Sequence, residues 1–244
     1  MRTLTVDSEL SGADVALSEH NAHYVGRVLR LAAGDALRIV DAAGNVWVGV
    51  LTFREGIPWL TALDSLESGQ GGAPLILLSA LIKGPRFEYV LEKATELGAD
   101  VILPFVAARS IVKIPDAKLR SKQERWQRVC DSAIRQCKRP GRALVMACAP
   151  SLSDALDLAS TDGASLVALN EQDPGAKWPA DLSGPVALVV GPEGGFTNSE
   201  VDLLRQAGAH FAGLGPTILR AETATAAAVS TVRMVRAGLI QTRS

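Results

Sequence analysis

Short apolar runs alternate with helical patterns through the last two thirds of the chain. Five runs, at residues 75–81, 101–106, 165–170, 186–191 and 211–215, consist mostly of residues that proteins bury. Such runs are typical of strands covered on both faces, as in a parallel sheet. Because segments with helical periodicity lie between them, the pattern predicts an α/β domain with a largely parallel sheet.

Glycines and capping residues indicate where two of these helices begin and end. The segment 86–97 is followed by Gly98, and a second helix over 200–207 is followed by a glycine in the same position. Glycine ends helices readily because it adopts left-handed backbone angles. Thr197 and Glu200 match a capping box, so the second helix should start directly after Thr197.

Two further helices differ in composition. The segment 119–139 has one apolar stripe at helical spacing, which includes Trp126 and Ile134, and carries positive charge on its other faces. The segment 222–232 has small side chains on every face. Small residues let another backbone approach closely, so this helix could pack beneath a ligand loop, against a second subunit, or inside its own domain.

The first 70 residues predict a small β-rich module. Strands at 36–40 and 46–51 flank a hairpin turn at 41–45, and a third strand follows at 59–63. A short helix is predicted over residues 20–31. The stretch 67–74 is rich in small flexible residues and is the best candidate for a linker, which divides the chain into domains at 1–70 and 74–244.

Charge and cysteine content narrow the class of protein. The chain has 244 residues, is 48% hydrophobic and has a net charge of −1. Residues 109–142 nevertheless hold eleven lysines and arginines against three acids, which is typical of a phosphate-binding face on an acidic body. Three irregularly spaced cysteines suggest neither a disulfide framework nor a zinc cluster, and fit a reducing cytoplasm. We expect no signal peptide, and the longest apolar run is too short to span a bilayer.

A glycine-rich turn, Gly191-Pro192-Glu193-Gly194-Gly195, joins an apolar strand to the capped helix. It carries a carboxylate and no lysine, so it matches neither a Walker loop nor the dinucleotide fingerprint of an oxidoreductase. A neutral or cationic ligand therefore suits it better than a polyanion. The strand ends at 169–171 and 214–223 also carry turn residues, and the three ends should meet at one edge of the sheet to form a ligand pocket. The alternative for any one loop is that its glycines only end a strand.

These residues carry a family resemblance. The glycine-rich turn, followed by residues 214–224 with the sequence Leu-Gly-Pro-Thr-Ile-Leu-Arg-Ala-Glu-Thr-Ala, resembles the paired C-terminal motifs of the RsmE-type 16S ribosomal RNA (uridine-N3) methyltransferases of the SPOUT superfamily. The similarity extends to residues 83–88, 124–129 and 136–139, and residues 23–30 resemble the family's PUA-like RNA-binding domain.

The resemblance implies a SPOUT α/β domain, with a trefoil knot in its C-terminal segment, preceded by a small PUA-like β-barrel. It also implies a homodimer, S-adenosylmethionine as cofactor, 16S ribosomal RNA or the small ribosomal subunit as partner, and no metal. Together with the strand ends, it predicts cofactor contacts at Leu169, Asn170, Gly191, Pro192, Glu193, Gly194, Gly195, Leu214, Gly215, Ile218, Leu219, Arg220, Thr223 and Ala224.

The implied reaction assigns roles to a few side chains. Methylation at N3 makes the ring nitrogen the nucleophile, so no covalent cysteine is needed. Arg220 is expected to stabilise a uracil oxygen or orient the base, with Glu222 as its partner or as a proton acceptor. Arg220 could instead form a structural salt bridge, and Glu193 could either act in catalysis or hold its loop through backbone bonds. The expected RNA contacts are Arg27, Arg30, Arg86, Arg109, Lys113, Lys138 and Arg139.

Three other functions remain open from the sequence. A related methyltransferase could act on another RNA, such as transfer RNA, although the motifs outside the cofactor loops argue against it. A non-catalytic RNA-binding or ribosome-assembly factor could retain the fold, although its cofactor motifs are intact. A Rossmann oxidoreductase fits the strand and helix pattern but lacks the fingerprint.

Overall fold

The chain folds into two compact units, seen in a computed structural model that describes residues 2–67, 72–139, 141–159, 163–169 and 175–241. The smaller unit combines Met1–Gly72 with Asp131–Arg142, and the larger combines Ala73–Cys130 with Ala143–Ser244. The return of a later segment to the first unit is not evident in the sequence pattern.

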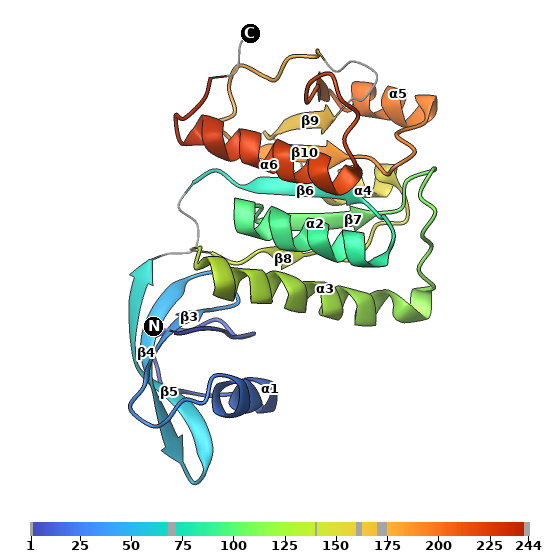
Figure 1. Cartoon of the computed structure of the whole chain (residues 1–244). Coiled ribbons are helices and arrows are strands. Elements are labelled where there is room, and N and C mark those ends of the chain that lie inside the picture. The colour runs from blue at the N-terminus through green and yellow to red at the C-terminus, as the bar shows by residue number, and fades with distance from the viewer. Residues whose placement is uncertain (1, 68–71, 140, 160–162, 170–174, 242–244) are drawn as a thin grey trace. The chain divides into compact units, whose positions relative to one another are not determined.

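The larger unit is built on a six-stranded sheet in the order β11-β9-β10-β6-β7-β8, with every neighbouring pair parallel (Figure 1). Five strands occupy predicted runs and end within three residues of them. Short β8 was not predicted. The strands are β6 (Leu75–Ala80), β7 (Val101–Phe105), β8 (Leu144–Val145), β9 (Ser165–Leu169), β10 (Val186–Val190) and β11 (His210–Ala212). All five residues of β10 are buried, as expected for a strand covered on both faces.

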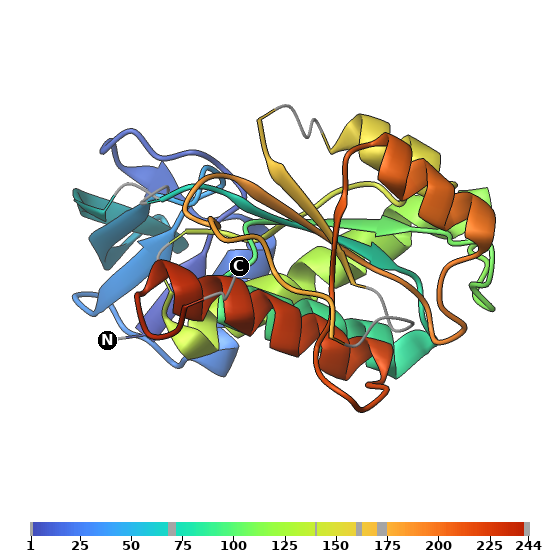
Figure 2. The same ribbon diagram turned by 90° about the horizontal axis from the view of Figure 1, so that it is seen from above.

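Helices cover both faces of this sheet. The helices α2 (Gly84–Leu97) and α6 (Ala221–Arg236) pack against each other on one face, and α4 (Leu152–Leu158) and α5 (Asn198–Gln206) lie on the other (Figure 2). On the α4 and α5 side, Leu152 and Leu204 join alternate residues of the strands in one apolar core. The predicted C-terminal glycine of α2 is confirmed, since Gly98 has a φ of 108°.

The long helix α3 (Asp116–Cys137) begins in the larger unit and ends in the smaller one. In the larger unit Trp126 packs edge-on against Phe87 of α2, with ring centroids 4.9 Å apart. The helix was predicted over 119–139 but ends at Cys137, because Lys138 takes a left-handed backbone conformation with a φ of 56°.

The smaller unit contains a five-stranded mixed sheet in the order β1-β3-β4-β5-β2. Its strands are β1 (Arg2–Thr5), β2 (Val15–Ala16), β3 (Ala36–Val40), β4 (Val46–Arg54) and β5 (Ile57–Glu67). The helix predicted over residues 20–31 is a short α1 (Glu19–His23) that widens into a π-helical turn, η1 (Tyr24–Val28). The core of the smaller unit includes the fully buried side chains of Leu4, Ile39 and Leu60.

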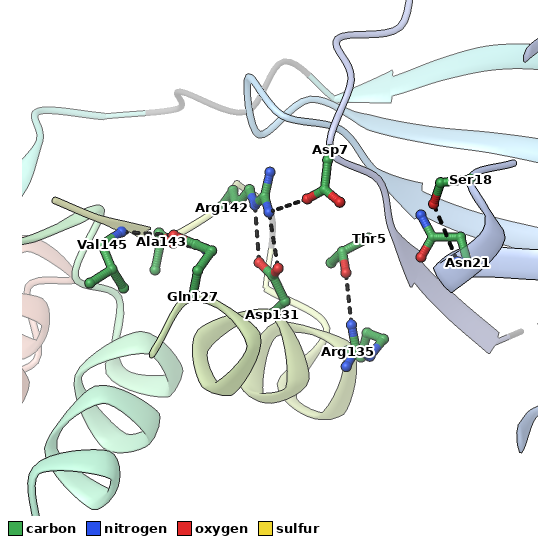
Figure 3. Close-up of polar contacts among 10 residues, drawn as sticks. All are labelled: Thr5, Asp7, Ser18, Asn21, Gln127, Asp131, Arg135, Arg142, Ala143 and Val145. Atoms are coloured by element: carbon green, nitrogen blue, oxygen red, sulfur yellow. Dashed lines mark hydrogen bonds and ion pairs between the residues drawn. The ribbon is translucent and has the colours of Figure 1, made fainter. Parts of the chain in front are cut away.

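Two buried carboxylates organise the smaller unit. At the predicted hairpin, Asp41 accepts hydrogen bonds from the backbone N–H groups of Leu10 and Asn45 and from Trp47 Nε1. Near the end of α3, Asp131 accepts two hydrogen bonds from Arg142, at 3.0 and 2.9 Å (Figure 3). Burial lowers the pKa of Arg142, but its bonds to Asp131 and Asp7 outweigh that effect and raise it above its ordinary value.

The cysteines are free thiols. Cys130 is buried, and Cys137 and Cys148 are half-buried. Burial raises the pKa of Cys148 to about 11, so this thiol is protonated and unreactive at neutral pH. Among the helices described, none is long and apolar enough to cross a membrane, and no cluster of potential metal ligands occurs in the described part of the chain.

Candidate functional site

Three strand ends meet at one edge of the larger unit's sheet. Because β11, β9 and β10 are parallel neighbours, their carboxyl ends lie side by side. A cavity of about 330 Å³ opens there, between the end of β9, the glycine-rich turn after β10 and the segment between β11 and α6. Ten residues predicted to contact a cofactor line it: Leu169, Gly191, Pro192, Glu193, Gly195, Leu214, Gly215, Ile218, Leu219 and Ala224. The cavity is mainly apolar, and Glu193 is its only charged residue among those described.

Glycine gives the turn after β10 its shape. A Cβ on Gly191 would lie 3.2 Å from the ring of Phe196, which is tighter than ordinary contact. Gly195 has a φ of 66°, in the region that favours glycine, and its N–H donates to the carbonyl of Pro192 at 2.9 Å. Glycine at these positions therefore lets the turn fold back over its own aromatic residue, and a larger residue at either position would strain it.

Two arginines from distant segments hold the turn in place. Arg86, in the first turn of α2, forms an ion pair with Glu193, with 3.1 Å between Nη1 and Oε1. Arg109 donates to the carbonyl oxygens of Gly194 at 2.9 Å and Phe196 at 3.2 Å. Both arginines were predicted to bind RNA, and the structure places both against the glycine-rich turn. The carboxylate of Glu193, whose role the sequence left open, is engaged by an arginine side chain.

Glu200 connects the start of α5 to the loop after β7. The capping box is confirmed, since Thr197 and Glu200 exchange hydrogen bonds at the helix start. The second carboxylate oxygen of this buried residue accepts a hydrogen bond from the N–H of Ala108 at 2.9 Å. Glu200 therefore positions the residue directly before Arg109, a function that the local motif alone does not reveal.

The segment after β11 is fixed at its first residue. The N–H of Gly213 donates to the carbonyl of Ala176 at 2.8 Å, and the indole of Trp178 donates to the carbonyl of Gly213 at 2.9 Å. Further along, Gly215 has a φ of 99°. Ile218 is 82% exposed although it lines the cavity, so an apolar side chain stands at its mouth.

The expected catalytic pair lies where this segment enters α6. Arg220 is the exposed N-cap of α6, between Leu219 and Ala221, which both line the cavity. Glu222, in the first helical turn, is 9% exposed, and its Oε2 atom is buried without a hydrogen-bond partner among the described residues. Within that part of the chain, no ion pair joins the two side chains.

Some predicted contacts fall outside the cavity lining. Gly194, Arg220 and Thr223 are beside lining residues without being among them, and Asn170 lies outside the described residues. Five lining residues lie outside the predicted loops, at strand ends, directly after the glycine-rich turn and in the first turn of α5: Val190, Phe196, Val201, Phe211 and Ala212. Pro216, Thr217 and Ala221 also line the cavity and lie in the predicted segment 214–223, although none of them was named as a cofactor contact. Position alone could have indicated several of them, because they adjoin predicted turns.

The remaining predicted RNA contacts lie on exposed segments. Arg27 of η1 and Arg30 are exposed in the smaller unit, as is Lys138, whereas Arg139 is half-buried and its carbonyl accepts a hydrogen bond from Arg38. In the larger unit, Lys113 is exposed between β7 and α3.

Comparison with known proteins identifies the family. An RNA methyltransferase domain matches residues 71–233, and an RNA methyltransferase PUA domain matches residues 17–55. The ribosomal RNA small subunit methyltransferase E of Mycobacterium bovis is 36% identical over 228 residues, which cover 91% of this chain and 87% of that protein. The protein of the same name from Bacillus subtilis is 30% identical over 227 residues, covering 89% and 88%.

A solved structure agrees with these sequence matches. Ribosomal RNA small subunit methyltransferase E from Neisseria gonorrhoeae, bound to S-adenosyl methionine, superposes with a TM-score of 0.81 at 25% identity and covers 96% of this chain and 98% of its own. Both domains, the relatives and the fold lead to one conclusion. The chain belongs to the family of ribosomal RNA small subunit methyltransferase E proteins.

Proposed function

We propose that this protein is an S-adenosylmethionine-dependent enzyme that methylates N3 of a specific uridine in 16S ribosomal RNA of the small ribosomal subunit. The observation that carries the proposal is the cavity at the joined ends of β9, β10 and β11, built from the two C-terminal motifs. Membership of the family and the cofactor bound by the Neisseria relative support it.

The cavity fits this cofactor in size and chemistry. Its volume of about 330 Å³ lies within the usual range of small-molecule sites, about 300–1,000 Å³. The apolar walls suit an adenine ring, whose edge the backbone groups of the loops would read. A sulfonium cation is compatible with Glu193 and would be repelled by a lining lysine or arginine, of which the described lining has none.

The proposed reaction needs an oriented base and a proton acceptor. Bound S-adenosylmethionine would supply an electrophilic methyl group to the uracil N3, which first loses its imide proton, and S-adenosylhomocysteine would leave as the sulfur–methyl bond breaks. Arg220 donates hydrogen bonds to a uracil carbonyl oxygen, where negative charge develops. Glu222 accepts the proton at Oε2, because a buried carboxylate oxygen without a partner is costly unless it binds a donor during function. The alternative role for Glu222, holding Arg220 in place, predicts that Glu222→Gln retains most of the activity.

The rest of the assignment follows the same proposal. Residues 1–70 form the PUA-like RNA-binding domain, which residues 131–142 join in the smaller unit, and residues 74–244 supply the methyltransferase domain, whose C-terminal segment is knotted. The enzyme works in the cytoplasm as a homodimer. Phosphate contacts come from the basic residues named above, and the exposure of Arg27, Arg30 and Lys113 supports their part in them.

Replacement of Arg220 tests the catalytic assignment. Arg220→Ala should lower kcat for methylation of unmodified small subunits by about 10²–10³-fold, as expected for loss of one donor to developing charge. The dissociation constant for S-adenosylmethionine, measured by calorimetry, should stay within about threefold, because Arg220 does not line the cavity. Arg205→Ala, an exposed arginine of α5, is the matched control. Equal losses of kcat and cofactor affinity would refute the role of Arg220.

A further inference from the structure

A second cavity lies wholly within the smaller unit. It has a volume of about 360 Å³ and is bounded by β1, the turn around η1 and the end of α3. Three cationic side chains, Arg2, Arg135 and Lys138, line it, and none of its described lining residues is acidic. Arg2 and Lys138 are exposed. Because the whole chain has a net charge of −1, this local concentration of positive charge indicates an anionic ligand.

Arg135 is held in the wall of this cavity by two contacts. Its guanidinium carbon lies 4.8 Å from the centre of the Tyr24 ring, and its Nη1 donates to the Thr5 hydroxyl at 2.7 Å (Figure 3). Among the described residues, this is the only hydrogen bond that the Arg135 guanidinium makes. A guanidinium has five N–H donors. An arginine fixed in this way with donors to spare is suited to bidentate recognition of phosphate.

Thr3 supplies independent evidence for a ligand. It lines the cavity and is 6% exposed, and its buried Oγ1 has no hydrogen-bond partner among the described residues. Thr3 and Thr5 lie on the same face of β1, whereas Leu4 points into the core. Thr5 receives the Arg135 hydrogen bond, but Thr3 has no such partner. A buried hydroxyl left unsatisfied is costly in the free protein, and a bound ligand would remove that cost.

The other lining groups suit a nucleoside. Ser132 and Gln136 add neutral donors and acceptors from successive turns of α3, and Tyr24 and Leu29 add aromatic and apolar surface. Phosphate binding combined with a ring surface and neutral polar groups is typical of single-stranded RNA recognition.

We propose that this cavity binds one nucleotide of the RNA substrate, with its phosphate held between Arg2, Arg135 and Lys138. The inference rests on the proposed function, because it takes the negatively charged ligand to be that RNA. It adds a defined nucleotide site in the smaller unit, formed jointly by β1 and residues 132–138, which are far apart in the sequence.

A charge-neutralising double variant tests the site. Arg2→Gln with Lys138→Gln changes two exposed side chains, and the matched control, Arg54→Gln with Arg205→Gln, removes the same charge from exposed arginines outside both cavities. Binding of unmodified small subunits is measured over a range of salt concentrations, together with S-adenosylmethionine affinity. Each phosphate contact contributes about 0.7 to the slope of log affinity against log salt concentration. The loss of two contacts should therefore lower this slope by about 1.4 and the affinity at 0.1 M salt by about 25-fold. Cofactor affinity should stay within about twofold.

Thr3→Val separates a ligand contact from a structural role. This nearly isosteric change removes the unpartnered hydroxyl, so it should leave the melting temperature unchanged or higher while weakening subunit binding by about fivefold. Unchanged subunit affinity would contradict a ligand contact by Thr3.

Each outcome separates this site from the proposed function. A double variant that binds subunits within threefold of its control overturns the nucleotide site, and methyl transfer by the wild type would still stand. Wild-type protein that binds subunits without transferring methyl groups overturns the proposed function. The nucleotide site is then still tested by comparing the subunit affinities of the double variant and its control. Inorganic phosphate that binds this cavity without competing with subunits would identify a free-phosphate site and overturn the inference. Wild-type protein that does not bind subunits contradicts both.

Discussion

Glu200 should link the stability of the larger unit to cofactor binding. Its side chain, 9% exposed, accepts hydrogen bonds from the N–H groups of Thr197 at 2.8 Å and Ala108 at 2.9 Å. Glu200→Ala removes the capping interaction, worth about 1 kcal/mol, and a hydrogen bond to a charged acceptor, worth about 1.5 kcal/mol. We expect the free energy of unfolding to fall by about 2–3 kcal/mol. Glu200→Gln keeps one acceptor oxygen and should cost about 1 kcal/mol.

The assay pairs urea unfolding, followed by circular dichroism, with calorimetry of S-adenosylmethionine binding. Cofactor affinity should fall with stability, because Ala108 precedes Arg109, which holds the glycine-rich turn at Gly194. Hydrogen exchange at the Ala108 amide should also accelerate. Glu124→Gln is the control: its pair with Arg120 lies on the exposed surface of α3, so the change should cost less than about 0.5 kcal/mol. A loss of less than about 0.5 kcal/mol in Glu200→Ala, with unchanged cofactor affinity, would contradict a link between Glu200 and the cofactor site.

Three further predictions test separate parts of the structure. Gly191→Ala introduces a Cβ 3.2 Å from ring atoms. The strained turn should bind S-adenosylmethionine about tenfold more weakly in calorimetry, and unchanged affinity would contradict the packing argument. Asp131→Asn leaves the charge of Arg142, whose side chain is 11% exposed, without its buried partner. It should cost about 3 kcal/mol in urea unfolding, whereas Asp7→Asn, at a 77% exposed side chain, should cost under about 1 kcal/mol; equal costs would count against the buried pair. With its pKa raised to about 11, Cys148 should be alkylated at pH 8 about 100-fold more slowly in the native protein than in urea, as peptide mass spectrometry would show; equal rates would contradict burial of the thiol.

The parts of the fold that depend on local sequence were predictable. Strand burial, the capping box of Thr197 and the C-terminal glycine Gly98 each involve residues within a few positions of one another. Their preferences come from backbone geometry and short-range hydrogen bonds, which a single sequence displays directly. Strand order is different, because it depends on which strands pair across long connections.

The long-range contacts of the sites were not predictable. Arg109 and Gly194 are 85 residues apart, and Arg135 and Thr5 are 130 apart. Arg86 and Arg109 were assigned to RNA binding from their positive charge and from the family resemblance, and neither of these shows that a side chain also holds a loop. The apolar stripe of α3 likewise runs on without a break while the helix passes from one unit to the other, so helical periodicity could not show that its last turns pack against β1.

The decisive measurement is the identity of the methylated nucleoside. The protein is incubated with labelled S-adenosylmethionine and small ribosomal subunits that lack the modification, and the ribosomal RNA is digested and analysed by mass spectrometry. We expect label in 3-methyluridine at one position of 16S ribosomal RNA, and its loss with Arg220→Ala. Label in any other nucleoside, or none with wild-type protein that binds the cofactor, would contradict the proposed function.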